Sequence, residues 1–210
     1  MKSKDAGRKT MSFYDEKYGT KEYYWTLEPS ETCFRVLRKR PPLGPMNLLD
    51  IGCGEGRNAV FFARNGYLVD AMDISGKGVE KTKLLAKSAN VSLNAFQADI
   101  NAYRLEKEYD VLFSTGTFHC VPEDKRRGLL EHYKEKTRPG GVHMFSVFVQ
   151  KPFIAPAPDR DPNANPWRSG ELLGYYGDWR IEWCTEEIFD CNSSGVPHQH
   201  ATDRVLAVKP

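Results

Sequence analysis

The stretch LLDIGCGEGRN, from Leu48 to Asn58, constrains the fold of this chain more than any other feature. An apolar, strand-like run ends directly in three glycines that alternate with other residues. Glycine permits positive φ angles and lets a ligand approach the backbone, so a turn of this kind after a strand indicates a nucleotide-like ligand. We therefore expect an α/β fold with its binding site at the carboxyl end of this strand.

Strand-like segments alternate with helical patterns over most of the chain. This alternation predicts a parallel sheet covered by helices on both faces and joined by right-handed crossovers. The RPGG sequence at residues 138–141 is expected to turn the chain into its fifth strand. Strands are expected at residues 47–51, 67–73, 92–97, 109–115 and 142–149, and helices at residues 30–40, 57–65, 75–89 and 123–137.

The remaining segments flank this core. Residues 1–10 are polar and basic, which predicts a mobile tail. Six aromatic residues between Phe13 and Trp25 suggest either a lid or a helix docked on the core. A loop with five prolines at residues 151–168 precedes a short helix and two closing strands, expected at 171–176, 179–184 and 202–208. We expect a single domain, residues 1–210, composed of a tail and cap (1–45), a ligand-binding core (46–150), a loop insertion (151–178) and a closing hairpin (179–210).

Composition excludes several classes of protein. The formal net charge of +2 is too balanced to indicate nucleic acid or an anionic membrane as a partner. The five cysteines form no CxxC spacing, so we expect neither a disulfide framework nor a structural zinc site. The N-terminus has no apolar signal-peptide core, and no apolar run approaches the roughly 18 residues of a membrane span. We expect a cytoplasmic monomer or homodimer.

The glycine spacing restricts the ligand further. A dinucleotide-binding turn reads GxGxxG, and Arg57 stands where its third glycine would be. Glu55 within the turn would repel a phosphate. Asp73, at the end of the second expected strand, can accept hydrogen bonds from both ribose hydroxyls, and Asp99, after the third, from an exocyclic adenine amine. These features predict an adenosine without phosphate, although three ordinary turns would be the alternative interpretation.

Longer motifs resemble a known family. LLDIGCGEGRNAVFFARNGYLVDAMDIS, QADI, YDVLFSTGTFHC and RPGG resemble class I S-adenosylmethionine-dependent methyltransferases over about residues 45–150. YDEKYG, EPS, GEGRN and SGELLGYYGDWRI are similar to the tellurite-resistance (TehB-like) methyltransferases, which are related to thiopurine and thiol S-methyltransferases. The resemblance implies a three-layer, Rossmann-like doubly wound sheet of about seven strands, mostly parallel, with one antiparallel strand in a C-terminal hairpin. It also implies S-adenosylmethionine as cofactor and a small, soft nucleophile as methyl acceptor.

The resemblance implies roles for individual residues. Gly52 and Gly54 would contact the methionine part through their backbone, Asp73 would hold the ribose, and Thr115 would border the sulfonium. Arg57 would reach the methionine carboxylate or pair with Glu55. Aromatic rings near the sulfonium would stabilise its charge by cation–π attraction, and Tyr14 is a further candidate for such a ring. The predicted cofactor-binding residues are Tyr18, Trp25, Asp50, Gly52, Gly54, Glu55, Arg57, Asp73, Ile74, Asp99, Ile100, Thr115 and Phe118.

The acceptor side offers fewer signals. STGTFHC lacks the Asn/Asp-Pro-Pro-aromatic array of amino-directed DNA and protein methyltransferases, which favours a small-molecule acceptor over nucleic acid. His119 is a candidate general base or, alternatively, polar surface. His198 and His200 point the same way on a strand and could orient an acceptor, and Arg204 could bind an anionic one. HxH could also be half of a metal site, but no companion Cys or acid has suggestive spacing, so no metal is predicted.

The sequence therefore predicts a methyltransferase that transfers a methyl group from S-adenosylmethionine to a small molecule, such as a thiol or a tellurite- or selenite-type oxyanion. Two alternatives stay open at this point. An NAD-linked oxidoreductase would use the same glycine turn and acid, and a non-catalytic S-adenosylmethionine-binding module would explain the absence of an obvious catalytic base.

Overall fold

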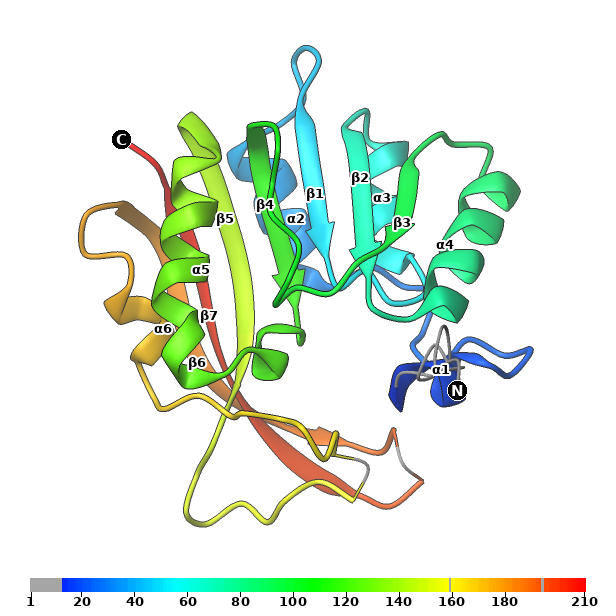
Figure 1. Ribbon diagram of the computed structural model, residues 1–210, viewed down its shortest axis with the longest axis vertical. Coiled ribbons are helices and arrows are strands. Elements are labelled where there is room, and N and C mark those ends of the chain that lie inside the picture. The colour runs from blue at the N-terminus through cyan, green and yellow to red at the C-terminus, as the bar shows by residue number, and fades with distance from the viewer. Residues whose placement is uncertain (1–12, 159, 194) are drawn as a thin grey trace, which may run out of the picture.

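Seven strands form one sheet, with the order β3-β2-β1-β4-β5-β7-β6 (Figure 1). The computed structural model describes residues 13–158, 160–193 and 195–210, so the tail predicted for residues 1–10 lies outside the described residues. The strands are β1 (Asn47–Ile51), β2 (Leu68–Asp73), β3 (Asn94–Gln97), β4 (Tyr109–Thr115), β5 (Thr137–Val149), β6 (Arg180–Cys191) and β7 (His198–Val208).

The strands β1 to β5 pair in parallel, and β7 runs antiparallel to both of its neighbours, β5 and β6. One antiparallel strand in a C-terminal hairpin is the arrangement that the sequence predicts, and the three-layer α/β fold is confirmed. The helices are α1 (Phe13–Tyr18), α2 (Glu31–Lys39), α3 (Arg57–Arg64), α4 (Gly76–Ser88), η1 (Phe118–Cys120), α5 (Glu123–Glu135) and α6 (Glu171–Gly174).

Helices cover both faces of the sheet, α5 on one side and α2 and α3 on the other (Figure 1). Two separate clusters of buried apolar side chains correspond to these faces. β4, with the sequence YDVLFST, is buried over its first six residues because its alternate side chains enter both clusters. The helix α4 begins at a capped residue, since the Ser75 hydroxyl accepts a hydrogen bond from the Gly78 N–H at 3.0 Å.

Two late elements differ from the prediction. RPGG does not precede the fifth strand but lies inside β5 as a bulge, because Thr137 already pairs with Tyr109 before Val142 pairs with Val111. The hairpin of β6 and β7 is longer than expected and extends past the carboxyl ends of the parallel strands (Figure 1). Its outer part is largely exposed, so backbone pairing continues where the hydrophobic pattern that predicts strands has ended.

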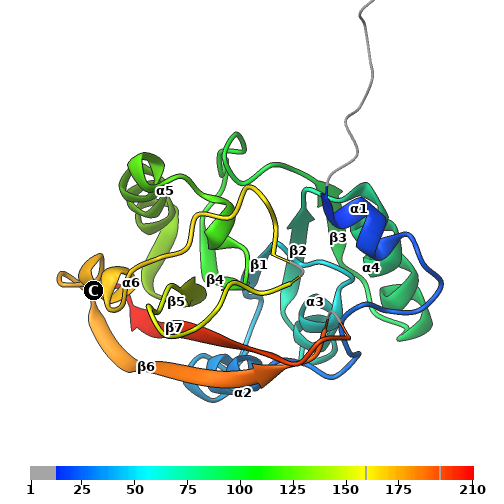
Figure 2. The same cartoon turned by 90° about the horizontal axis from the view of Figure 1, so that it is seen from below.

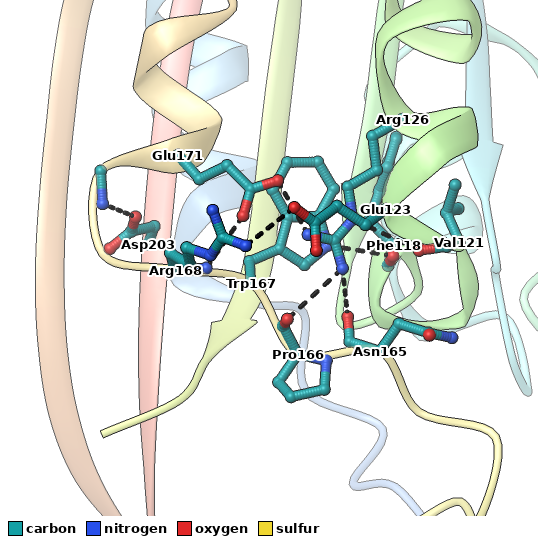
Figure 3. A network of polar contacts seen from close by, with 11 residues as sticks. Phe118, Val121, Glu123, Arg126, Asn165, Pro166, Trp167, Arg168, Glu171 and Asp203 are labelled. Atoms are coloured by element: carbon teal, nitrogen blue, oxygen red, sulfur yellow. Dashed lines mark hydrogen bonds and ion pairs between the residues drawn. The ribbon is translucent and has the colours of Figure 1, made fainter. Parts of the chain in front are cut away.

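The proline-rich loop before α6 is held to the core by one buried arginine (Figure 3). Arg126 of α5 is 2% exposed, pairs with Glu171 at 2.8 Å and donates to the Asn165 carbonyl at 2.6 Å. Its guanidinium lies 4.3 Å from the ring centroid of the fully buried Trp167. The loop is thereby fixed beside η1, since the Trp167 indole also donates to the Phe118 carbonyl.

Among the described residues, the helices are all too short or too polar to cross a membrane.

Candidate active site

The ends of four parallel strands meet at the carboxyl edge of the sheet. The chain passes from β1 to β2 and β3 on one side and then returns to β4 and β5 on the other, so the topological switch point lies between β1 and β4. Ligands of doubly wound sheets bind at this point. The glycine turn follows β1, Asp73 ends β2, and Thr115 ends β4, so the predicted donor residues come together here.

The turn after β1 requires its glycines. Gly52 and Gly56 have φ angles of +74° and +93°, which L side chains rarely adopt. A Cβ at Gly52 would lie 1.9 Å from the Thr117 hydroxyl oxygen, and one at Gly56 would lie 2.8 Å from the Thr82 backbone. The turn is therefore closely packed between η1 and α4 rather than open as a loose loop.

The N–H groups of the turn are already engaged within the protein. Turns that hold a phosphate leave such groups free to point at the anion. Here the turn directs them inward, which disfavours a pyrophosphate and agrees with the unusual glycine spacing. The N–H groups of Gly52 and Cys53 donate to the Met72 carbonyl, that of Gly54 to the Asp73 carboxylate and that of Gly56 to the Cys53 carbonyl.

Two buried carboxyl groups lie beneath the turn. Asp50 is 1% exposed, and burial, together with the nearby Asp73, raises its pKa to about 7. Burial raises the pKa of Asp73 to about 6, although the Ser75 and Gly54 N–H groups counteract part of this rise. One oxygen of Asp50, Oδ2, has no hydrogen-bond partner among the described residues. A cationic ligand group would satisfy this pair of carboxyl groups, whereas an anion would be repelled.

Asp73 is oriented by the backbone on both sides. Its Oδ2 accepts from the Gly54 N–H and its Oδ1 from the Ser75 N–H, each at 2.8 Å. A carboxylate has about four lone-pair positions, so each oxygen keeps one for a further donor. Asp73 can thus receive the two hydroxyls of a ribose without giving up either backbone contact.

Glu55 does not pair with Arg57, which was one of the two predicted alternatives. It is 3% exposed, pairs with Lys81 of α4 at 2.7 Å and accepts the Trp25 N–H at 3.1 Å. Arg57 instead donates to the Thr26 hydroxyl at 3.3 Å. Glu55 therefore ties the segment before α2 to the glycine turn.

Aromatic residues from the N-terminal segment cover the turn. Tyr18 is 4% exposed, its hydroxyl accepts the Trp25 indole N–H at 3.0 Å, and both rings lie beside Gly54. Asp15 accepts from the Ser75 hydroxyl at 2.6 Å, which docks α1 at the beginning of α4. Both views place α1 near α4 at the carboxyl edge (Figure 2). The predicted cap is thus a short helix docked directly above the donor turn.

His119 is not polar surface. It is 6% exposed, and its Nε2 lies 3.0 Å from the Tyr14 hydroxyl of α1. Burial lowers its pKa to about 4, with Asp161 counteracting this and His200 adding to it, so the ring is neutral at physiological pH. Its Nδ1 is buried and lacks a partner among the described residues. A neutral imidazole beside the end of β4 can accept a proton or orient a neutral acceptor.

Phe118 belongs to the core rather than to the ligand-facing surface. Its ring is fully buried and lies 4.7 Å from the Phe145 ring centroid and 6.2 Å from that of Tyr133. The turn of η1 directs this side chain under α5, while the next residue, His119, faces α1. This packing disfavours the predicted contact of the Phe118 side chain with the cofactor.

The other predicted donor residues lie along the same edge. Asp99 is exposed, and its Oδ1 accepts from the Asn101 N–H at 2.8 Å. Ile74 is 42% exposed directly after Asp73, and Ile100 is buried. An exposed apolar side chain between two strand ends offers a flat contact for an adenine ring. Thr115 is half-buried and accepts the Asn58 amide at 3.4 Å.

The late acceptor candidates divide into two groups. His198 and His200 adjoin each other, with their Nε2 atoms 3.0 Å apart. Arg204 lies farther along β7, roughly 13 Å from His200 at strand spacing, and pairs with Glu187 at 2.8 Å. The structure therefore brings the two histidines together but does not bring Arg204 to them.

One residue beside this pair escapes prediction from sequence. Cys191 ends β6 directly opposite His198 in the hairpin register, so a cysteine stands beside HxH although its spacing along the sequence does not suggest one. Six residues lie between Cys191 and His198, and they carry no strand pattern. Only the extended pairing of the hairpin could reveal this neighbour.

Comparison with known proteins supports this assignment of the fold. The chain matches the sequence family described as tellurite resistance protein TehB over residues 11–196. It is 31% identical over 204 residues to hemagglutinin 1 of Eikenella corrodens, which covers 95% of this chain and 66% of that protein. It is 27% identical over 174 residues to the probable S-adenosyl-L-methionine-dependent methyltransferase TehB of Haemophilus influenzae, covering 82% of this chain and 58% of that protein.

The fold has a similar counterpart among solved structures. The crystal structure of TehB from Haemophilus influenzae matches with a TM-score of 0.75 and 22% identity, over 94% of this chain and 66% of that one. The chain spans 66% and 58% of the lengths of the two relatives named above. Since the family match covers most of the chain, this protein belongs to the tellurite resistance protein TehB family, as its motifs predict.

Proposed function

We propose that this chain transfers a methyl group from S-adenosylmethionine to a small, soft acceptor, such as a thiol or a tellurite- or selenite-type oxyanion. The observation that carries the proposal is the pair of buried acids, Asp50 and Asp73, beneath a turn whose N–H groups are engaged internally. A donor with a cationic methionine part and a ribose but no phosphate satisfies both features. The Haemophilus influenzae relative, a probable S-adenosyl-L-methionine-dependent methyltransferase, supports the same donor.

Each part of the site has a role in this proposal. Asp50 accepts the cationic methionine part, Asp73 the ribose hydroxyls, and Asp99 with the Ile100 N–H the adenine. Ile74 packs on the adenine face, and Thr115 borders the reacting sulfur. S-adenosylmethionine supplies an electrophilic methyl carbon on a positively charged sulfur.

Positioning and exclusion of water account for most of the catalysis. Methyl transfer needs the nucleophile in line with the breaking bond, which an enclosed site enforces. Tyr18 and Trp25 close the donor side, and the Tyr14–His119 contact closes the side toward the acceptor. The acceptor's lone pair forms the new bond to the methyl carbon, and the electrons of the old bond return to the donor sulfur. A thiol releases its proton to solvent in this step, and the neutral His119, whose pKa is lowered to about 4 by burial, can orient the acceptor by hydrogen bonding.

The cellular context follows the same proposal. Within the described residues, the five cysteines are all free thiols, as expected for a reducing compartment. We propose a single cytoplasmic methyltransferase domain, monomeric or homodimeric, with a small molecule rather than nucleic acid as its partner.

An acceptor panel tests the proposal. Purified protein is incubated with S-adenosylmethionine and with a thiol, a selenite, a tellurite or a phenol, and the demethylated donor is quantified. We expect acceptor-dependent turnover with at least one sulfur, selenium or tellurium compound, and none with Asp73→Ala. Binding of the donor without turnover on any acceptor would indicate a binding module and contradict the proposal.

A further inference from the structure

The tip of the β6–β7 hairpin gathers a thiol and two imidazoles that the methyl-donor site does not use. Cys191 ends β6, and His198 and His200 begin β7 on the same side of the strand. One potential ligand atom from each residue lies within 4.8 Å of the other two. All three side chains are half-buried. From this geometry we infer that Cys191, His198 and His200 form a three-ligand site for a borderline-soft divalent metal ion, zinc above all.

The spacing of the two histidines suits a tetrahedral ion with little rearrangement of their rings. Two histidine nitrogens on one zinc ion are about 3.4 Å apart, as bond lengths of roughly 2.0–2.1 Å and tetrahedral angles require. The Nε2 atoms of His198 and His200 are 3.0 Å apart, so the rings need to separate by only about 0.4 Å. A thiolate with two imidazoles is a ligand set that zinc favours over calcium or magnesium.

The tautomer of His198 already suits metal binding. Its Nδ1 lies 2.7 Å from the Val196 carbonyl, and because a carbonyl only accepts, Nδ1 carries the proton. The neutral ring therefore has its lone pair on Nε2, the atom that faces His200. A metal-binding histidine commonly donates its second nitrogen to a backbone carbonyl, which fixes the ring and strengthens the ligand.

Three protein ligands leave the fourth position of a tetrahedral ion open to an exchangeable molecule. The Phe148 ring lies beside the cluster, with its centroid 4.9 Å from that of His200 and 5.4 Å from that of His119. The site is thus one aromatic ring away from η1, which follows the end of β4. A thiol bound at the open position would release its proton to solvent, because the charge of the ion lowers the pKa of the thiol; that this thiol is then methylated rests on the proposed function.

Cobalt substitution tests the site without relying on methyl transfer. We expect the full chain to bind one equivalent of Co²⁺ with a thiolate-to-cobalt charge-transfer band and the intense visible bands of a four-coordinate ion. Zn²⁺ should displace the cobalt and abolish these bands. Adding 2-mercaptoethanol should shift the bands, because the thiol takes the open position.

Variants assign the signal to this cluster. Cys191→Ser should abolish the charge-transfer band. His200→Gln should weaken Co²⁺ binding by more than about 10–100-fold, the loss that is typical when a residue that only supports a metal ligand is replaced. Cys184→Ser is the matched control, because Cys184 is an exposed cysteine on the same strand. Thermal unfolding and donor affinity should match between the Cys191→Ser and Cys184→Ser variants, which separates lost metal from lost fold.

Three results would overturn the inference. The first is no charge-transfer band in the unmodified chain. The second is equal binding by the chain and its Cys191→Ser variant. The third is a signal lost in Cys120→Ser instead, which would place the ion at the separate His119–Cys120–Asp161 group. Failure of the acceptor panel alone would leave these metal measurements unchanged, so the two proposals fail separately.

Discussion

Replacing Asp50 by Asn should stabilise the donor-free protein at neutral pH and weaken donor binding. The carboxyl group is fully buried, and its pKa rises from the ordinary value of 3.8 to about 7. In the unfolded chain Asp50 ionises above about pH 4, whereas in the folded chain it stays protonated until about pH 7. Stability is therefore full below about pH 4 and falls as the pH rises toward 7.

The size of this fall follows from the two pKa values. A rise from 3.8 to about 7 corresponds to roughly 4 kcal/mol of unfolding free energy lost across that window. Asn stays neutral and can still accept the Ala59 N–H that Asp50 accepts, so the variant should lose most of this pH dependence. It cannot offer a negative charge to the donor, so its affinity for S-adenosylmethionine should fall roughly tenfold to a hundredfold.

Urea unfolding from pH 4 to 8, combined with calorimetric titration of the donor, measures both effects. Asp178→Asn is a suitable control. Asp178 is a mostly exposed carboxylate, and its hydrogen bond with Lys134 lowers its pKa, in contrast to the raised pKa of Asp50. The control should keep the fall in stability between pH 4 and 7 and leave donor affinity unchanged. If the unfolding free energies of Asp50→Asn and the unmodified chain fall in parallel between pH 4 and 7, the raised pKa of Asp50 does not cause the fall.

Three further substitutions test the packing around the site. Gly52→Ala should destabilise the protein by more than Gly140→Ala. Gly140 has a similar φ of +71° but open space around it, so its substitution should cost only about 1–2 kcal/mol of unfolding free energy. Equal losses of stability in chemical denaturation would contradict the close contact between Gly52 and Thr117. Ser75→Ala should cost about 1 kcal/mol of unfolding free energy through the lost cap of α4, and Ser75→Thr should recover most of it. Phe118→Ala should cost about 3–5 kcal/mol of unfolding free energy, and the folded variant should keep its donor affinity. Lost donor affinity with unchanged stability would instead support the predicted role of Phe118 at the cofactor.

The sequence predicts the donor half of the molecule well, for a physical reason. The strands β1, β2 and β4 are largely buried, and the helices α3, α4 and α5 that come after them each bury one face, so these elements leave a hydrophobic pattern in the residues. Because parallel strands end at one edge, the positions of Asp73, Asp99 and the glycine turn along the chain suffice to bring them together. The family match confirms the type of protein that these motifs predict.

The acceptor half leaves weaker signals. The tip of the β6–β7 hairpin is mostly exposed, so backbone pairing alone continues its strands and places Cys191 opposite His198. The sequence leaves His119 open between a general base and polar surface, because it contacts Tyr14, which is more than a hundred residues away in the sequence. Contacts of this kind depend on the tertiary fold, and local patterns of hydrophobicity do not contain them.

We expect the acid-lined turn to take a cationic adenosyl donor and not a phosphate-bearing dinucleotide. Isothermal titration of one protein preparation with S-adenosylmethionine, its demethylated product and NAD at pH 8 tests this most directly. One equivalent of the donor, or of its product, should bind, and NAD should give no heat of binding up to millimolar concentration. Binding of NAD with no binding of S-adenosylmethionine would contradict it.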